Sequence, residues 1–276
     1  MSATQISDAP SAAPVLRTVL RVIGWSGLGL MGVAVTLSDF LARAPAGATG
    51  IGPMLELPSA AHPFGTDFLG RDMLSESLHG LSVTMSHALV AAIVAIVLGG
   101  LSGAVAARLP HYSGLALRGI VGVFAAIPAL LLAVLMIGLT AREFAPLAAG
   151  LAAAPLAFVR AFDRVEAQGK STHAEYARAT GISGATLLRR DLIYEFRGTL
   201  SSVAARALAA VTIILSTVSF LGFGATPPAR DLGLMIAAAK TSYLHAWWTA
   251  AFPALALLVL ILCARLAAGL DEGERP

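Results

Sequence analysis

The chain has 276 residues, of which 57% are hydrophobic and only 13% are charged, and its mean hydropathy is +0.79. Soluble domains carry roughly 25% charged residues, so this composition excludes an ordinary soluble protein and predicts an all-α integral membrane protein. The net charge of +3 does not indicate nucleic-acid binding, because basic residues of membrane proteins set their orientation. The single cysteine, Cys263, excludes an intrachain disulfide and a cysteine metal cluster.

Six segments are long and apolar enough to cross a bilayer as helices, which takes roughly 20 residues each. In chain order they are residues 19–41, 82–107, 117–140, 144–162, 200–223 and 246–268. The polar stretch 1–14 before them is expected to be a disordered tail in the cytoplasm. Residues 15–276 are expected to form one transmembrane domain, whose first apolar run is retained and not cleaved as a signal peptide.

The distribution of basic residues predicts that both termini lie in the cytoplasm. Of the 19 Lys and Arg residues, Arg206 falls within a span and five fall outside the cell membrane, which leaves thirteen on the cytoplasmic side. The five are Arg43, Arg71, Arg142, Arg230 and Lys240. This orientation places residues 42–81 outside and the long loop 163–199 in the cytoplasm.

Four residues within the spans carry further predictions. Gly99 and Gly103 form a GxxxG pattern, which lets a neighbouring backbone approach closely. Pro128 removes a backbone hydrogen bond and should kink the third span. Arg206 lies about two turns from the inner end of its helix, where snorkelling toward water is expected; a place on a translocation path is the alternative.

The stretch 160–197 carries seven Lys or Arg residues and a helix–turn–helix pattern. Thr172 and Glu175 have the spacing of a capping box, which starts a helix. Gly181 is placed to end that helix, and Ser183 can cap a second one. We therefore predict two short helices joined by a glycine turn at the cytoplasmic face.

Two other interpretations of this stretch fail. A DNA-binding helix-turn-helix would not be tethered to membrane spans at both ends. Gly169, Lys170 and Ser171 look like the end of a phosphate-binding loop, but Arg164 stands where that motif needs its first glycine. Any energy from ATP must then come from a partner.

Several co-linear stretches resemble the dipeptide/oligopeptide/nickel family of ABC transporter permeases, in its C-type subunit. Glu175, Ala177 and Gly181 match the spacing of the EAA loop of importer permeases, with Tyr176 in place of the usual small residue. The further matching stretches are HPFGTDFLGRD at 62–72, SFLGFG at 219–224 followed by two prolines, and GLMI at 233–236.

This resemblance implies a six-helix type I importer permease in the bacterial inner membrane, without catalytic activity or a cofactor of its own. The implied partners are a second, homologous permease subunit in a heterodimer, two ATPase subunits that bind ATP and Mg, and an extracytoplasmic substrate-binding protein, all within membrane lipid. The implied cargo is dipeptides, oligopeptides, nickel or metal chelates.

Two sets of residues carry the implied function. The ATPase-coupling set is Glu175, Tyr176, Ala177, Gly181, Ile182 and Ser183. The outer-gate signature is His62, Gly65, Asp67, Gly70, Arg71 and Asp72. We expect the signature to act as a rigid collar that braces an outer gate, and not to contact cargo directly.

Physical features of the outer segment add detail to this expectation. Gly65 and Gly70 are expected in tight turns, and Arg71 in an ion pair with Asp67 or Asp72. An apolar stripe suits an interfacial helix; its members are Phe68, Leu69, Met73, Leu74 and Leu78.

The histidines and tryptophans of the outer segments are given structural roles. His79 and His87, with Met85 between them, could contact a metal-bearing cargo, but histidines at helix ends are more often interfacial anchors, and no metal site is expected. Trp247 and Trp248 lie at a membrane boundary, where an aromatic belt is expected.

Two other classes of membrane protein fit the sequence less well. An ion-coupled secondary transporter usually has carboxylates inside its spans and internal repeats, and no Asp or Glu falls in the middle of a predicted span. A membrane-embedded hydrolase would need a nucleophile and a base facing each other in the bilayer, and no such Ser/His pair is apparent.

Overall fold

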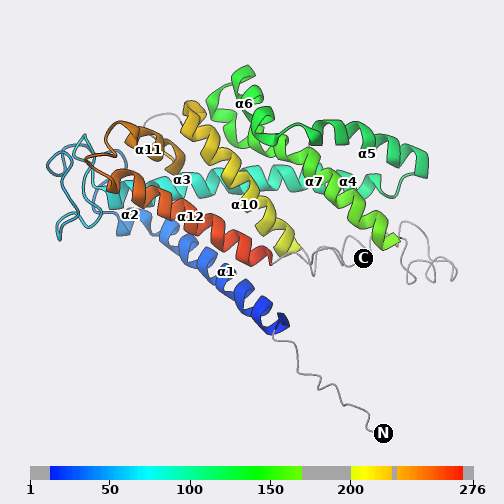
Figure 1. Ribbon diagram of the computed structural model, residues 1–276, viewed down its shortest axis with the longest axis horizontal. Helices are drawn as coiled ribbons and strands as arrows, with labels where there is room; N and C mark the ends of the chain where they lie inside the picture. The colour runs from blue at the N-terminus through cyan, green and yellow to red at the C-terminus, as the bar shows by residue number, and fades with distance from the viewer. Residues whose placement is uncertain (1–12, 170–199, 226–228, 270–276) are drawn as a thin grey trace, which may run out of the picture.

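The computed structural model describes residues 13–169, 200–225 and 229–269, and these residues form a helical bundle (Figure 1). Within this part of the chain no strand occurs, and only an isolated antiparallel bridge joins Thr66 to Asp72. The long helices lie roughly along one another, and the loop of residues 42–72 covers one end of the bundle. We call this end the loop end.

Five helical segments are long and apolar enough to cross a membrane. They are Val15–Thr36, Met73–Ala106, Arg142–Ala167, Ser201–Phe223 and Trp248–Ala268. The first span is helix α1 (Ala13–Thr36), and the last is α12 (Trp248–Ala268). The second consists of α3 (Met73–Val94), η1 (Ala95–Leu101) and α4 (Ser102–Ala106). The segment from Arg142 consists of η2 (Arg142–Phe144) and α7 (Ala145–Gly169), and the segment from Ser201 of α10 (Leu200–Val218) and η4 (Ser219–Phe223). Helix α1 starts inside the stretch assigned to the tail. The predicted spans 19–41, 82–107, 144–162, 200–223 and 246–268 are confirmed with shifted ends.

The third predicted span is broken into two helices, α5 (His111–Ala126) and α6 (Ala129–Leu139), that meet at 83°. Pro128 is the N-cap of α6, and Ile127 before it has an extended backbone with φ −76° and ψ 130°. Proline disfavours a helical conformation in the preceding residue and cannot donate to the preceding turn. The expected kink is therefore a complete break, and the bundle has six spans only if this bent pair counts as one.

The predicted close approach at Gly99 and Gly103 is confirmed. A Cβ on Gly99 would overlap the carbonyl oxygen of Ala154, and one on Gly103 would overlap that of Phe158, both on α7. The π-helical turn η1 contains Gly99, so the widened stretch of the second span is the one that packs on α7.

Small residues also bring the first and last spans together. A Cβ on Gly24 of α1 would overlap the backbone of Ala267, and one on Gly27 would overlap Sγ of Cys263 on α12. Cys263 is therefore a buried filler in this contact, as a small apolar residue. Figure 1 shows α1 and α12 side by side, with α3, α10 and α7 forming the middle of the bundle.

Three further short elements complete the described chain. Helix α2 spans Ser38–Leu41, α11 spans Leu232–Ala238, and η5 spans Ala239–Thr241. Helix α11 packs against α12, α3 and η4 near the loop end. The loop end is thus built from segments far apart in the sequence.

Candidate functional site

The six signature residues lie together in one hydrogen-bonded loop at the loop end. Thr66, inside this loop, is completely buried and organises it. Its hydroxyl accepts a hydrogen bond from Glu56 N at 2.8 Å and donates one to Pro53 O at 2.5 Å. Its carbonyl oxygen accepts from the indole Nε1 of Trp248 at 3.0 Å, which ties the loop to the first turn of α12.

Asp67, Gly70 and Arg71 form a tight turn. Oδ1 of Asp67 accepts hydrogen bonds from Leu69 N at 2.8 Å and from Arg71 N at 2.9 Å, as in an Asx turn. Gly70 has a φ of +68°, in the left-handed region that glycine adopts without strain. Gly65 has a φ of +69°, so both glycines lie in the predicted turns.

Asp72 caps α3 and joins it to His62. One carboxylate oxygen, Oδ2, accepts from Ser75 N at 2.9 Å and from Ser75 Oγ at 2.7 Å, while Oδ1 lies 3.0 Å from His62 Nδ1. Burial raises the pKa of Asp72, but the hydrogen bonds from His62 and Ser75 outweigh burial, so its pKa lies below the ordinary 3.8. The carboxylate is the charged anchor of the loop.

Two carboxylates and two guanidinium groups alternate behind this turn. Glu76 Oε2 lies 3.7 Å from Arg71 and 3.5 Å from Arg230, and Asp67 Oδ2 lies 3.9 Å from Arg71 and 3.7 Å from Arg230. All four side chains are at most 17% exposed. The predicted ion pair of Arg71 with Asp67 is confirmed, whereas Asp72 pairs with His62 instead.

The predicted interfacial helix is wrong. Phe68 and Leu69 lie in the Asp67 turn and not in a helix, and α3 begins at Met73, which is 3% exposed. The polar first turn of α3 is buried as well, because Ser75 Oγ accepts from the backbone of Arg43 and Ala44 and Glu76 accepts from Gly47 N. This stretch is the start of a spanning helix.

The predicted aromatic belt is also wrong for Trp248. Its side chain is buried under the loop, 2% exposed, whereas Trp247 is 58% exposed at the surface. Phe64 of the loop stacks on Phe252 of α12, with ring centroids 4.0 Å apart. Trp248 and Phe252 therefore dock the loop on the last span.

The SFLGFG segment is held by Asp231, which the sequence analysis did not single out. The Asp231 carboxylate accepts from Ser219 Oγ, from Ala225 N at 3.0 Å and from Leu234 N at 2.9 Å. It thereby caps α11 and ties its start to the end of η4, where Gly222 has a φ of +94°. An aspartate three residues before Leu234, at a helix start, was the signal that would have found it.

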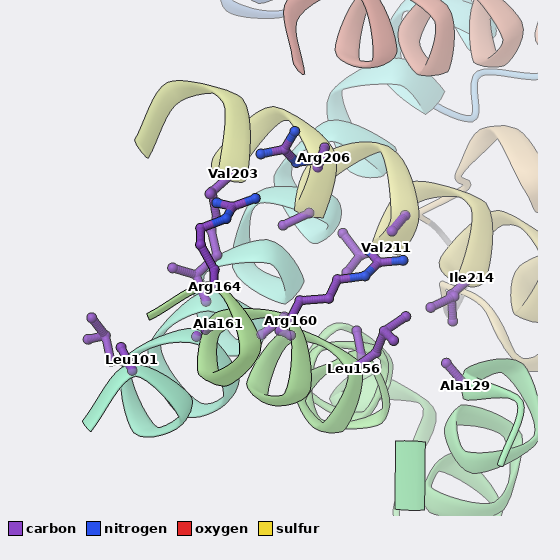
Figure 2. A pocket seen from close by; sticks show the side chains of 18 of the residues that line it. Leu101, Ala129, Leu156, Arg160, Ala161, Arg164, Val203, Arg206, Val211 and Ile214 are labelled. Carbon is purple, nitrogen blue, oxygen red and sulfur yellow. The ribbon is translucent and has the colours of Figure 1, made fainter. Parts of the chain in front are cut away.

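A cavity of about 190 Å³ lies toward the opposite end of the bundle, between the η1–α4 stretch, α7 and α10 (Figure 2). Its lining is apolar except for three arginines, Arg160 and Arg164 on α7 and Arg206 on α10. Arg206 donates to Ser202 Oγ at 3.4 Å, one turn earlier on α10.

Other predicted sites are placed as follows. The coupling set, from Glu175 to Ser183, lies outside the described residues. His79 contacts Ala44 O at 3.3 Å, and the half-buried His87 lines a small pocket together with Asp231. Within residues 13–169, 200–225 and 229–269, no group of three or more His, Cys, Asp or Glu residues is placed to hold a metal ion.

Sequence comparison finds relatives among transport system permeases, although no family model matches the chain. A putative peptide transport system permease protein of Brucella suis is 26% identical over 92% of this chain and 88% of its own length. The di/tripeptide transport system permease protein DppC of Pseudomonas aeruginosa is 27% identical over 83% of this chain and 74% of its own. The glutathione transport system permease protein GsiD of Escherichia coli is 31% identical over 79% of this chain and 72% of its own.

Proposed function

The chain belongs to the dipeptide/oligopeptide/nickel family of ABC transporter permeases, a multi-pass protein of the bacterial inner membrane, and from this we propose that it is a membrane-spanning subunit of an ATP-driven peptide importer. The observation that carries the proposal is the similarity to peptide, dipeptide and glutathione permeases over most of the chain. Nickel or a metal chelate is the less supported cargo, because the named relatives carry peptides.

The architecture supports a role in transport. The cavity opens between three spanning segments, the η1–α4 stretch, α7 and α10, and the bend at Pro128 turns α5 away from α6 beside it. One chain supplies only one wall of a passage, so we propose that a second, homologous permease subunit supplies the other. A binding protein outside would deliver the cargo, and two ATPase subunits would supply ATP and Mg.

The collar at the loop end supports an outer role for the signature. Its residues bond to one another and to the first turn of α3, Thr66 within the loop bonds to Trp248 of α12, and the turns around Asp67 and Asp72 are filled by their own hydrogen bonds. We propose that this rigid loop braces an outer gate, with both chain termini in the cytoplasm.

Coupling to the ATPase is assigned to Glu175, Ala177 and Gly181 with their flanking helices. ATP-driven closure of the ATPase pair would push these helices and switch the passage between outward and inward access. Replacing Gly181 by Leu places a side chain where a left-handed residue is expected, and we expect ATP hydrolysis to continue while uptake falls at least tenfold. A normal uptake rate in Gly181→Leu would refute the coupling assignment.

The proposed function is tested by purifying the chain from its native host in mild detergent and identifying what accompanies it by mass spectrometry. Recovery of one related permease and one or two ATPases, with ATP-dependent peptide uptake after reconstitution into liposomes, is the expected result. Recovery of the chain alone, active in uptake driven by an ion gradient, would instead establish the ion-coupled transporter.

A further inference from the structure

The three arginines of the cavity stand in an otherwise apolar lining. They lie on helices that cross the membrane: Arg160 and Arg164 within the last ten residues of α7, and Arg206 as the seventh residue of α10. Arg160 and Arg164 are four residues apart, so their charges share one face of α7 and repel each other. Charged residues inside spans usually face a passage and mark the path of a substrate or ion.

Snorkelling toward water does not account for Arg160. In Figure 2 its side chain runs along the cavity toward Val211 of α10, away from Arg164 and the end of α7. A snorkelling side chain would point toward the helix end. Arg160 makes no hydrogen bond or ion pair with any residue in the described part of the chain.

The lining combines positive charge with an apolar wall, and this combination indicates an anionic ligand with an apolar part. Every described residue of the lining other than the three arginines is Ala, Gly, Val, Leu or Ile, so within the lining no side chain can accept a hydrogen bond from the guanidinium of Arg160. Guanidinium groups bind carboxylates through two parallel hydrogen bonds, and more strongly in an apolar site than in water. The apolar wall beside them suits an aliphatic side chain.

We propose that this cavity is a cargo subsite, in which Arg160, supported by the charges of Arg164 and Arg206, binds a carboxylate of the peptide while an aliphatic group of the same peptide contacts the Ala- and Val-rich wall. A volume of about 190 Å³ is below the range of about 300–1,000 Å³ for complete ligand pockets. The cavity therefore fits an acidic end with one side chain, and not a whole oligopeptide. This inference rests on the proposed function, because it names what the importer carries.

The test uses the assembled transporter, purified without its binding protein and placed in phosphatidylcholine nanodiscs without ATP. Binding of the dipeptide alanyl-leucine is compared with binding of its C-terminal amide, for the wild type, Arg160→Gln and Arg142→Gln. Arg142 is an exposed arginine of η2 outside the cavity lining, so it controls for the loss of a positive charge. We expect about tenfold weaker binding for the amide and for Arg160→Gln, and no change for Arg142→Gln.

Three results would overturn the proposal: no binding of alanyl-leucine to the wild type, equal binding of the amide, or undiminished binding in Arg160→Gln. A lipid phosphate offers the same anionic chemistry, so the series is repeated with phosphatidylglycerol in the nanodiscs. Loss of dipeptide binding there, together with retention of phosphatidylglycerol by the purified wild type but not by Arg160→Gln, would assign the cavity to lipid instead. ATP-driven uptake of alanyl-leucine by the wild type in liposomes tests the proposed function separately. If uptake occurs but the binding experiments fail, only the subsite is refuted and the proposed function stands.

Discussion

At the scale of single residues, the outer-gate signature is built from turns and a helix cap, the structural roles that its Asp and Gly residues predict. Asp67 closes a turn, Gly70 supplies the left-handed backbone of that turn, and Asp72 starts a helix. These are the ordinary uses of Asp and Gly in turns and caps. What distinguishes Asp72 is that its carboxylate is completely buried and also holds His62. Its charge therefore contributes to stability and depends on pH.

Replacing Asp72 by Asn tests this contribution. Asparagine can still cap α3, but it loses the charge that binds His62 and Ser75, and we expect a loss of about 1–2 kcal/mol near neutral pH. Because the folded-state pKa of Asp72 lies below its ordinary 3.8, the wild type keeps this advantage above about pH 4 and loses it as pH falls through the folded pKa. The difference in Tm between wild type and Asp72→Asn should be present at neutral pH and shrink as the pH falls below about 4.

Intrinsic tryptophan fluorescence in a nonionic detergent provides the measurement. Asp39→Asn is the control for loss of a carboxylate, because the Asp39 side chain is 98% exposed and its ion pair with His79 at 3.9 Å is too exposed to change Tm appreciably. A Tm difference for Asp72→Asn that persists undiminished at pH 3 would show that the charge of Asp72 does not stabilise the loop.

At the scale of helices, the contact of the second span with α7 depends on missing side chains. Gly99 faces the backbone of Ala154, whereas the adjacent Gly100 faces the cavity. A Cβ added to Gly100 would have Cγ2 of Ile96, at 3.9 Å, as its nearest neighbour. Gly99→Ala should lower stability by about 1–3 kcal/mol, because the new Cβ would force the two helices apart. Gly100→Ala should be neutral or stabilising by up to about 1 kcal/mol, because alanine is the better helix former.

Apparent Tm of the two variants in the same detergent decides between them. Each variant adds one methyl group to the same helical stretch, so general effects of alanine on helix stability cancel in the comparison. Equal Tm values for Gly99→Ala and Gly100→Ala would mean that the contact with α7 tolerates a wider spacing than the structure has.

The helices also show what apolar length can and cannot predict. Five spans follow from hydropathy alone, because only a helix satisfies its own backbone in lipid. The buried start of α3 does not follow from hydropathy, because Ser75, Glu76 and Ser77 are polar. The loop before the helix supplies partners for Ser75 and Glu76. The proline at 128 predicts a disturbance, but the 83° angle depends on what α5 and α6 pack against.

At the scale of the whole molecule, the loop end joins segments that no local pattern connects. Glu76 meets Arg230 from 154 positions away, and Thr66 bonds Trp248 from 182 positions away. The sequence predicts the signature as a unit and its turns, but not these partners, because a long-range contact leaves no periodicity or spacing in the chain. For the same reason the sequence predicts nothing about the neighbours of Arg206, whereas the structure places it in one cavity lining with Arg160 and Arg164.

Trp248 is the link through which the last span holds the loop, and Trp248→Phe tests it. Phenylalanine keeps a ring in the site but removes the Nε1 donor, which leaves the buried carbonyl oxygen of Thr66 without that partner. An unsatisfied buried acceptor costs about 1–3 kcal/mol. Since this cost falls on the contact between the loop and α12, local opening of residues 42–72 should become more frequent, and limited proteolysis should cut there several-fold faster.

The control is Trp247→Phe, which alters an exposed ring beside Trp248 and should leave the cleavage rate unchanged. If both variants were cut at the wild-type rate, the loop would be held by its own turns and by the stacking of Phe64 on Phe252, and the collar would be independent of the last span.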